Sequence, residues 1–99
     1  MIILYVTHKD EKNARKIINH LMKKKLIACA NIFPIKSVYE WEGKIVDEGE
    51  IVTLLKTSNK LYSTVEKEIK KIHPYKIPCI IKIDAKANND YEKWINDCV

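Results

Sequence analysis

Two long strand-like segments flanking Glu42-Gly43 constrain the fold of this 99-residue chain more than any other feature. The first arm alternates in side-chain type over residues 35–41, and the second covers residues 45–57, with a bulge expected at Gly49. A dozen residues per arm, at about 3.3 Å each, reach roughly 40 Å. A compact domain of this length has a radius of gyration of only about 13 Å. The hairpin is therefore predicted to overhang the rest of the domain.

The overhanging arms carry large aromatic side chains, Tyr39 and Trp41, away from the predicted core. Exposed strand edges with large apolar side chains favour pairing with another chain, so we expect an oligomer. Residues 31–34 are expected to break the first arm, because Pro34 cannot donate a hydrogen bond to a neighbouring strand.

The other elements follow from apolar spacing and from capping residues. They are a strand over Ile2–Thr7, a helix capped by Asp10 and ended by Lys23–Lys25, a second helix capped by Ser58 or Asn59 and stopped by Pro74, a strand over Ile77–Ala85, and a short helix from Asp90. The apolar face of the first helix comprises Ala14, Ile17, Ile18, Leu21 and Met22. The order βαββαβ plus a C-terminal helix predicts an α+β, ferredoxin-like fold, an antiparallel sheet with helices on one face. We expect one domain over residues 1–99.

Composition limits the classes of binding partner and the cellular compartment that we expect for this chain. The net charge is +5, yet only one basic residue, Arg15, is an arginine, which argues against sequence-specific nucleic-acid binding. The apolar runs are too short to cross a bilayer, and the N-terminal MIILYV does not resemble a signal peptide. The three cysteines are an odd number without a C-x-x-C motif, which is typical of reduced thiols. We therefore expect a cytoplasmic protein without a nucleic-acid or membrane partner.

No enzyme signature is present. The chain has only two glycines, which excludes a glycine-rich phosphate loop, and it contains neither G-x-S-x-G nor H-E-x-x-H. The candidate bases and thiol nucleophiles have no activating neighbour in the sequence. They are His8, His20, His73, Cys29 and Cys79. We therefore expect binding rather than catalysis.

The segment HPYKIPC, residues 73–79, has two interpretations. In the first, His73 and Pro74 end a helix, and Cys79 is a core-facing strand residue on the same face as Ile81 and Ile83. In the second, His73 and Cys79 are soft metal ligands, with a third ligand supplied by another element or subunit. The sequence leaves both open.

Four segments together resemble the CutA divalent-cation-tolerance family. They are, in this order along the chain, ACANIFPIKSVYEWEGKI, EGEIVTLLKT, HPYKIP and DYEKWI. The resemblance as a whole extends from Ile2 to about Ile95. The resemblance implies a homotrimer whose long hairpins pair between subunits. It also implies a role in tolerance of copper and other divalent ions by metal binding, with no obligatory cofactor.

The family architecture is similar to that of trimeric PII signal proteins, which implies ligand binding in clefts between subunits. Matching residues for such a cleft are Cys29, Asn31, Trp41, Lys56, His73, Tyr75 and Trp94. The alternative to a metal is thus a small anionic ligand near Lys56. This chain departs from the family at Lys76, where an acidic or polar residue is usual, at Cys79, where a glutamate is usual, and at Val6, where some members carry a cysteine. A sulfur donor at position 79 predicts a preference for Cu(I) over Mg or Ca.

Overall fold

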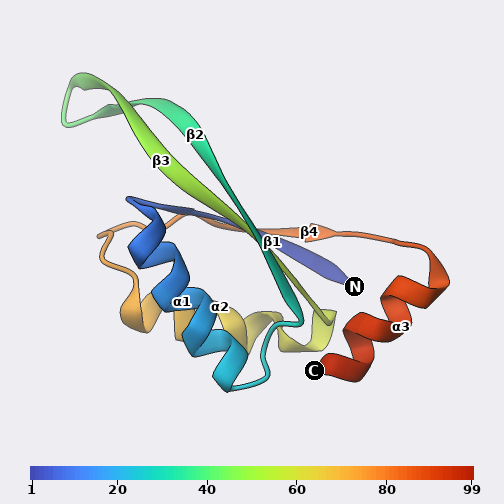
Figure 1. Ribbon diagram of the computed structural model, residues 1–99. Helices are drawn as coiled ribbons and strands as arrows, with labels where there is room; N and C mark the ends of the chain where they lie inside the picture. Colours follow the sequence, from blue (N-terminus) through green and yellow to red (C-terminus); the bar gives the residue numbers. More distant parts are fainter.

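The structure is a computed structural model that describes residues 1–99. Its elements are β1 (Ile2–His8), α1 (Glu11–Lys23), β2 (Cys29–Trp41), β3 (Lys44–Thr57), the 3-10 turn η1 (Asn59–Leu61), α2 (Tyr62–Ile72), β4 (Ile80–Asp84) and α3 (Asn89–Cys98). The strands form one antiparallel sheet in the order β2-β3-β1-β4 (Figure 1). The predicted order of elements is confirmed.

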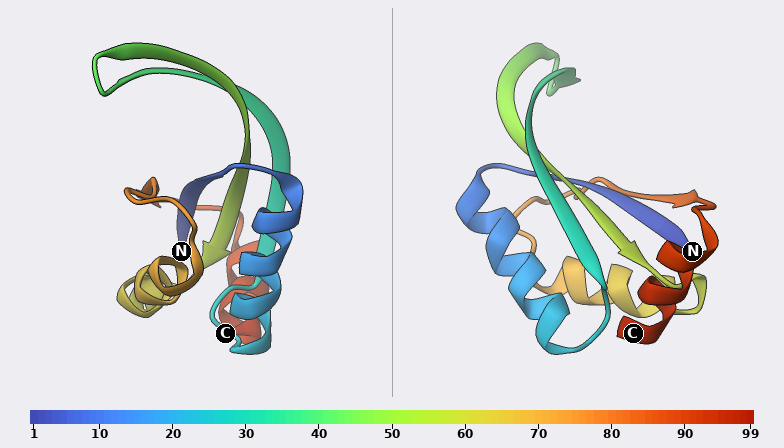
Figure 2. Two further views of the ribbon diagram at one scale, coloured as in Figure 1. Left: turned by 90° about the vertical axis from the view of Figure 1, so that its left-hand side faces the viewer. Right: turned by 45° about the vertical axis from the view of Figure 1, so that its right-hand side comes forward.

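The core lies between the sheet and the α1/α2 layer, which covers one face of it (Figures 1 and 2). Alternate β1 residues, Ile2, Leu4 and Val6, are fully buried and belong to the main core cluster. Ile17 and Leu21 of α1 complete the packing from the helix layer. Each such side chain contributes about 1.5–3 kcal/mol relative to an exposed one. Met22, expected on this apolar face, is instead 39% exposed.

Helix α1 is closed at both ends by local hydrogen bonds. The Asp10 carboxylate accepts from the Asn13 backbone N–H at 2.8 Å, as expected for an N-cap. At the other end the Lys25 and Leu26 N–H groups bond to the Met22 and Leu21 carbonyls, which is a Schellman motif. This motif places Lys25 at φ 55°, a conformation that favours glycine.

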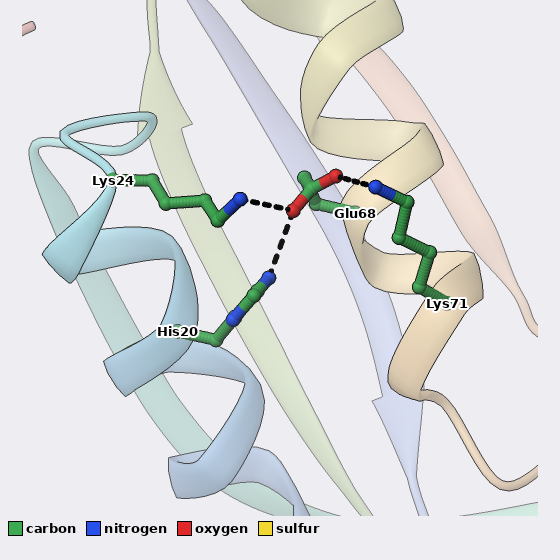
Figure 3. Close-up of polar contacts among 4 residues, drawn as sticks. All are labelled: His20, Lys24, Glu68 and Lys71. Carbon is green, nitrogen blue, oxygen red and sulfur yellow. Dashed lines mark hydrogen bonds and ion pairs between the residues drawn. The ribbon is translucent and has the colours of Figure 1, made fainter.

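A buried carboxylate joins the two core helices (Figure 3). The Glu68 side chain is only 8% exposed, and it contacts Lys71 Nζ at 2.6 Å, His20 Nε2 at 2.9 Å and Lys24 Nζ at 3.0 Å. Hydrogen bonds from Lys71, Lys24 and His20 lower the pKa of Glu68 to about 2. Because His20 and Lys24 come from α1 and its C-terminal end, Glu68 ties α1 to α2.

The β2-β3 hairpin extends beyond the rest of the molecule and curves to one side (Figures 1 and 2). It gives the molecule principal extents of 46 × 25 × 21 Å. Its turn residues, Glu42 and Gly43, have φ values of 50° and 77°, the two positive angles that a type I′ turn requires. The predicted overhang is therefore present in the structure.

Two predicted irregularities in the hairpin are wrong. Gly49 pairs with Lys36 in the same continuous register as the rest of the ladder, so it forms no bulge. Pro34 pairs opposite Ile51, and β2 continues through residues 31–34. Strand β2 is an edge strand, which tolerates proline because the missing N–H faces away from the ladder.

Strand β4 is shorter than the predicted Ile77–Ala85, and its faces are reversed. Ile80 aligns with Val6 and packs against the core, whereas Ile81 and Ile83 lie on the other face, 49% and 43% exposed. Alternation therefore places Cys79 on the sheet face away from α1 and α2, so the prediction of a core-facing Cys79 is wrong. Apolar residues occupy both faces of this strand, so alternation could not determine which face is buried.

Candidate functional site

A pocket of about 370 Å³ lies between the hairpin strands β2 and β3, the end of β1 and the loop after α2. Nine residues from these four segments line it: Thr7, Tyr39, Trp41, Glu48, Glu50, Tyr75, Lys76, Ile77 and Cys79. We call it the hairpin pocket. It contains Trp41, Tyr75 and Cys79 from the residues expected to bind a ligand or a metal.

Two carboxylates of β3 dominate the electrostatics of the hairpin pocket. Glu50 is only 8% exposed, and its Oε2 accepts a 2.5 Å hydrogen bond from the Tyr75 hydroxyl. Glu48 accepts a 2.6 Å hydrogen bond from the Tyr39 hydroxyl. Burial raises the pKa of Tyr75, and the bond to Glu50 raises it further, so the phenol stays protonated and acts as a donor. Neither carboxylate takes part in an ion pair within the chain.

His73 lies behind the hairpin pocket and is 8% exposed. Its Nε2 donates to the Thr7 carbonyl at 2.8 Å, and its Nδ1 accepts from the Tyr75 backbone N–H at 3.1 Å. These partners fix a neutral tautomer and engage both ring nitrogens. A metal could bind His73 only after one of these hydrogen bonds was broken. In this conformation His73 positions the 73–79 loop.

His8, the last residue of β1, is a second buried histidine and stands next to His73. Its ring stacks on His73 with centroids 5.5 Å apart, and its Nε2 lies 2.8 Å from the Thr53 hydroxyl. The Nδ1 atom is buried without a hydrogen-bond partner. Burial and the neighbouring His73 lower the pKa of His8 to about 4, although Glu50 opposes the shift. His8 is therefore neutral at physiological pH.

Cys79 is a protonated thiol at neutral pH. Burial raises its pKa, hydrogen bonding with Thr7 opposes the shift, and the Glu50 carboxylate adds to it. A protonated thiol is a weak nucleophile and must lose its proton to bind a metal. All three cysteines are free thiols, and no group of three or more His, Cys, Asp or Glu side chains is arranged to hold a metal ion. A single chain therefore does not supply a closed metal site.

The other expected ligand-binding residues lie at the far end of the sheet. Cys29 pairs with Lys56 across β2 and β3, and Asn31 lies on the same face of β2. Lys56 Nζ donates to the Tyr91 hydroxyl at 3.2 Å, and the Tyr91 ring lies 5.8 Å from that of Trp94. Lys56 lies six positions beyond Glu50 in β3, a distance of about 20 Å along the strand. Within one chain, the expected residues thus form two separate groups.

The sequence-based search missed the two carboxylates of the hairpin pocket. In the segment EGE, Glu48 and Glu50 lie two residues apart on a strand, so both side chains point to one face. That spacing was a usable signal. The partner of Glu50 was not predictable, because Tyr75 comes from a loop that lies 25 residues away in the sequence.

Comparison with known proteins identifies the family. Residues 2–98 match the family model described as CutA1 divalent ion tolerance protein. The chain belongs to the CutA1 family. The divalent-cation tolerance protein CutA of Pyrococcus horikoshii is 44% identical over 96 residues, which cover 96% of this chain and 94% of that one. The CutA1 description names ion tolerance and no catalytic activity.

Solved CutA structures share the fold. The periplasmic divalent cation tolerance protein CutA from Archaeoglobus fulgidus superimposes with a TM-score of 0.95 at 37% identity, covering 99% of this chain and 98% of that one. A PII-like CutA protein from Nostoc has a TM-score of 0.91 over 99% of this chain and 96% of its own, at 23% identity, which shows a common fold alone. No helix of this CutA1-family chain is both long and apolar enough to span a membrane.

Proposed function

We propose that this chain acts in divalent-cation tolerance as a cytoplasmic homotrimer with a ferredoxin-like fold, binding metal ions such as copper rather than catalysing a reaction. The observation that carries the proposal is the hairpin pocket, which is lined by Cys79 and by two carboxylates without an ion-pair partner, Glu48 and Glu50, in a CutA1-family chain. An acidic pocket with a sulfur donor attracts cations and favours soft metals such as Cu(I).

The proposed trimer supplies the additional metal donors that a single chain lacks. Large apolar side chains are exposed on the hairpin and on the open face of the sheet, among them Val38, Ile45 and Ile81. A surface of this kind supports association with further copies. In the trimer, a neighbouring subunit adds metal donors beside Cys79 and completes a site that the single chain leaves incomplete.

Titration of the metal-stripped, reduced protein with Cu(I) tests the metal proposal. We expect Cys79→Ser to weaken Cu(I) binding, while Cys98→Ser, at the end of α3, leaves it unchanged. Equal affinity in both variants would remove the hairpin pocket from metal binding. Fractionation of the native host tests the cytoplasmic location, since the A. fulgidus relative is described as periplasmic.

A second candidate function, a PII-like sensor of a small anion, is favoured by Lys56. Its ammonium group has no acidic partner, and it lies 5.3 Å from the centre of the Tyr91 ring in a half-buried position. Inorganic phosphate and citrate are suitable probes. Lys56→Met should abolish their binding, and binding that persists in this variant would exclude the Lys56 region as the anion site.

A further inference from the structure

Only one of the two carboxylate oxygens of the buried Glu50 side chain has a hydrogen-bond partner in the chain. Its Oε2 is bonded to Tyr75, but Oε1 has no hydrogen-bond partner in the chain, and no Lys, Arg or His pairs with this carboxylate. The Glu50 side chain lines the hairpin pocket, and Oε1 is not among the atoms enclosed without a partner. Its free oxygen therefore has access to the pocket. Buried carboxylates are normally paired, so this one is arranged for an external cation.

The walls of the hairpin pocket favour a cation with an apolar body. Tyr39, Trp41 and Tyr75 supply three aromatic side chains, and Ile77 adds an aliphatic one. Aromatic faces attract cations through the ring quadrupole and also cover apolar surface. Glu48 and Glu50 lie on the same face of β3, and their carboxylates add hydrogen-bond acceptors for the N–H donors of a bound cation.

The size of the hairpin pocket accommodates an organic cation as well as a bare metal ion. Its volume of about 370 Å³ falls in the range of small-molecule sites, roughly 300–1,000 Å³. No trio of metal-binding side chains converges there within the chain. Space and donor chemistry thus both match a ligand of several heavy atoms.

We propose that the hairpin pocket binds a primary alkylammonium ion. The ammonium group donates hydrogen bonds to Glu50 and Glu48, and the alkyl chain packs along Trp41 and the two tyrosines. This inference deepens the proposed function, because it rests on the same cation-attracting pocket but assigns it an organic cation. Lys76 also lines the pocket, and its positive charge opposes the ligand and limits the affinity.

Calorimetric titration of the metal-stripped, full-length protein in its native oligomeric state tests the proposal. The probes are n-butylammonium, 1-butanol, which has the same chain without the charge, and tetramethylammonium, which has the charge without N–H donors. We expect n-butylammonium to bind at least tenfold more tightly than either comparison compound, because hydrogen bonds to charged groups are strong. Equal binding of n-butylammonium and 1-butanol would overturn the proposal.

Matched variants locate the site. Glu50→Gln keeps the shape and the acceptor for Tyr75, and it should weaken n-butylammonium binding about tenfold. Glu40→Gln removes a charge from the opposite face of the same hairpin and should have no effect, whereas Lys76→Met should tighten binding severalfold. Trp41→Leu, at a position that is 43% exposed, removes one aromatic wall and should also weaken n-butylammonium binding. Unchanged affinity in both Glu50→Gln and Trp41→Leu would place the ligand elsewhere.

Failure of this inference is distinguishable from failure of the metal proposal. Cys79→Ser is expected to impair Cu(I) binding much more than n-butylammonium binding, because the ammonium group requires the carboxylates and not the thiol. Cu(I) binding without n-butylammonium binding would refute the inference alone. n-Butylammonium binding without Cu(I) binding would refute the metal proposal alone.

Discussion

At the scale of single residues, two buried polar side chains are held in opposite ionisation states by their surroundings. His8 is kept neutral by burial and by the adjacent His73, while Glu68 is kept charged by hydrogen bonds from Lys71, Lys24 and His20. Both depend on neighbours far away in sequence: 45 residues separate His8 from Thr53, and 48 separate His20 from Glu68. Each makes a separate contribution to the dependence of stability on pH.

The first prediction concerns His8. Its pKa is about 4 when folded and 6.5 as its ordinary value, so the unfolded chain binds the proton more readily. The free energy of unfolding should therefore be highest above pH 6.5 and fall by up to about 3 kcal/mol as the pH drops to 4. His8→Gln retains an amide near Thr53 and should reduce this fall in the free energy of unfolding. Denaturant titrations at pH 7, 6, 5 and 4 measure it. The same dependence of the free energy of unfolding on pH in the wild-type protein and in His8→Gln would contradict the lowered pKa of His8.

The second prediction concerns Glu68. Its folded pKa of about 2 lies below the ordinary value of 4.5, so its stabilising effect is complete above pH 4.5 and is lost as the pH falls toward 2. Glu68→Gln should lower the melting temperature at pH 7, because it leaves Lys24 and Lys71 without their counter-charge. Glu11→Gln is the matched control, since it removes an exposed ion pair with Arg15 on α1 and should change little. A melting temperature of Glu68→Gln as little changed as that of Glu11→Gln would contradict the prediction.

At the scale of elements, tight turns rather than strand interiors hold the strained residues. Glu42 and Lys25 are the two non-glycine residues with positive φ, and they close the hairpin and end α1 respectively. Side chains at such positions cost free energy that glycine or asparagine avoids. These positions are therefore the natural targets for stabilisation.

The third prediction follows from the type I′ turn. Glu42→Asn should raise the free energy of unfolding by about 0.5–1 kcal/mol, because asparagine adopts positive φ more readily than glutamate. Gly43→Ala should lower it by about 1 kcal/mol, because alanine is strained at φ 77° even though its Cβ would meet no neighbouring atom. Chemical denaturation measures both. A stabilising Gly43→Ala would show that the turn adopts another conformation.

The elements themselves were largely predictable from the sequence, and the site was only partly so. Alternation and helical spacing revealed the hairpin and the order βαββαβ with its terminal helix, because these patterns are local. The exposed face of Ile81 and Ile83 was not predictable, since a strand with apolar residues on both sides gives no preference. The hydrogen bond of His73 Nε2 was also not predictable from the sequence, because its partner, the Thr7 carbonyl, lies 66 residues away in the chain.

At the scale of the whole molecule, the exposed apolar side chains and the protruding hairpin both favour assembly with further copies of the chain. Ile45 and Ile77 are 74% and 70% exposed, and the edges of the sheet at β2 and β4 are unpaired within the chain. Unpaired edges beside apolar side chains favour assembly. The isolated chain is thus the building block that the proposed trimer requires.

The fourth prediction is the mass in solution. Light scattering at micromolar concentration should give three times the chain mass of 11.6 kDa. Ile81→Asp, on the open face of the sheet, should shift the mass toward that of the monomer, because it places a charge in an apolar interface. Lys60→Asp, on the exposed 3-10 turn, should leave the mass unchanged. A monomeric wild-type protein would refute the assembly.

The unbroken register of the hairpin also restricts how its length can change during evolution. One residue inserted into β3 between Glu50 and the core would turn every outer side chain to the opposite face, and Glu48 and Glu50 would leave the pocket. Viable insertions and deletions there must come in twos, matched on both arms. Each such step would displace the turn by roughly 7 Å while preserving the inward face. Hairpin lengths among descendants of this chain should therefore differ in discrete, even increments.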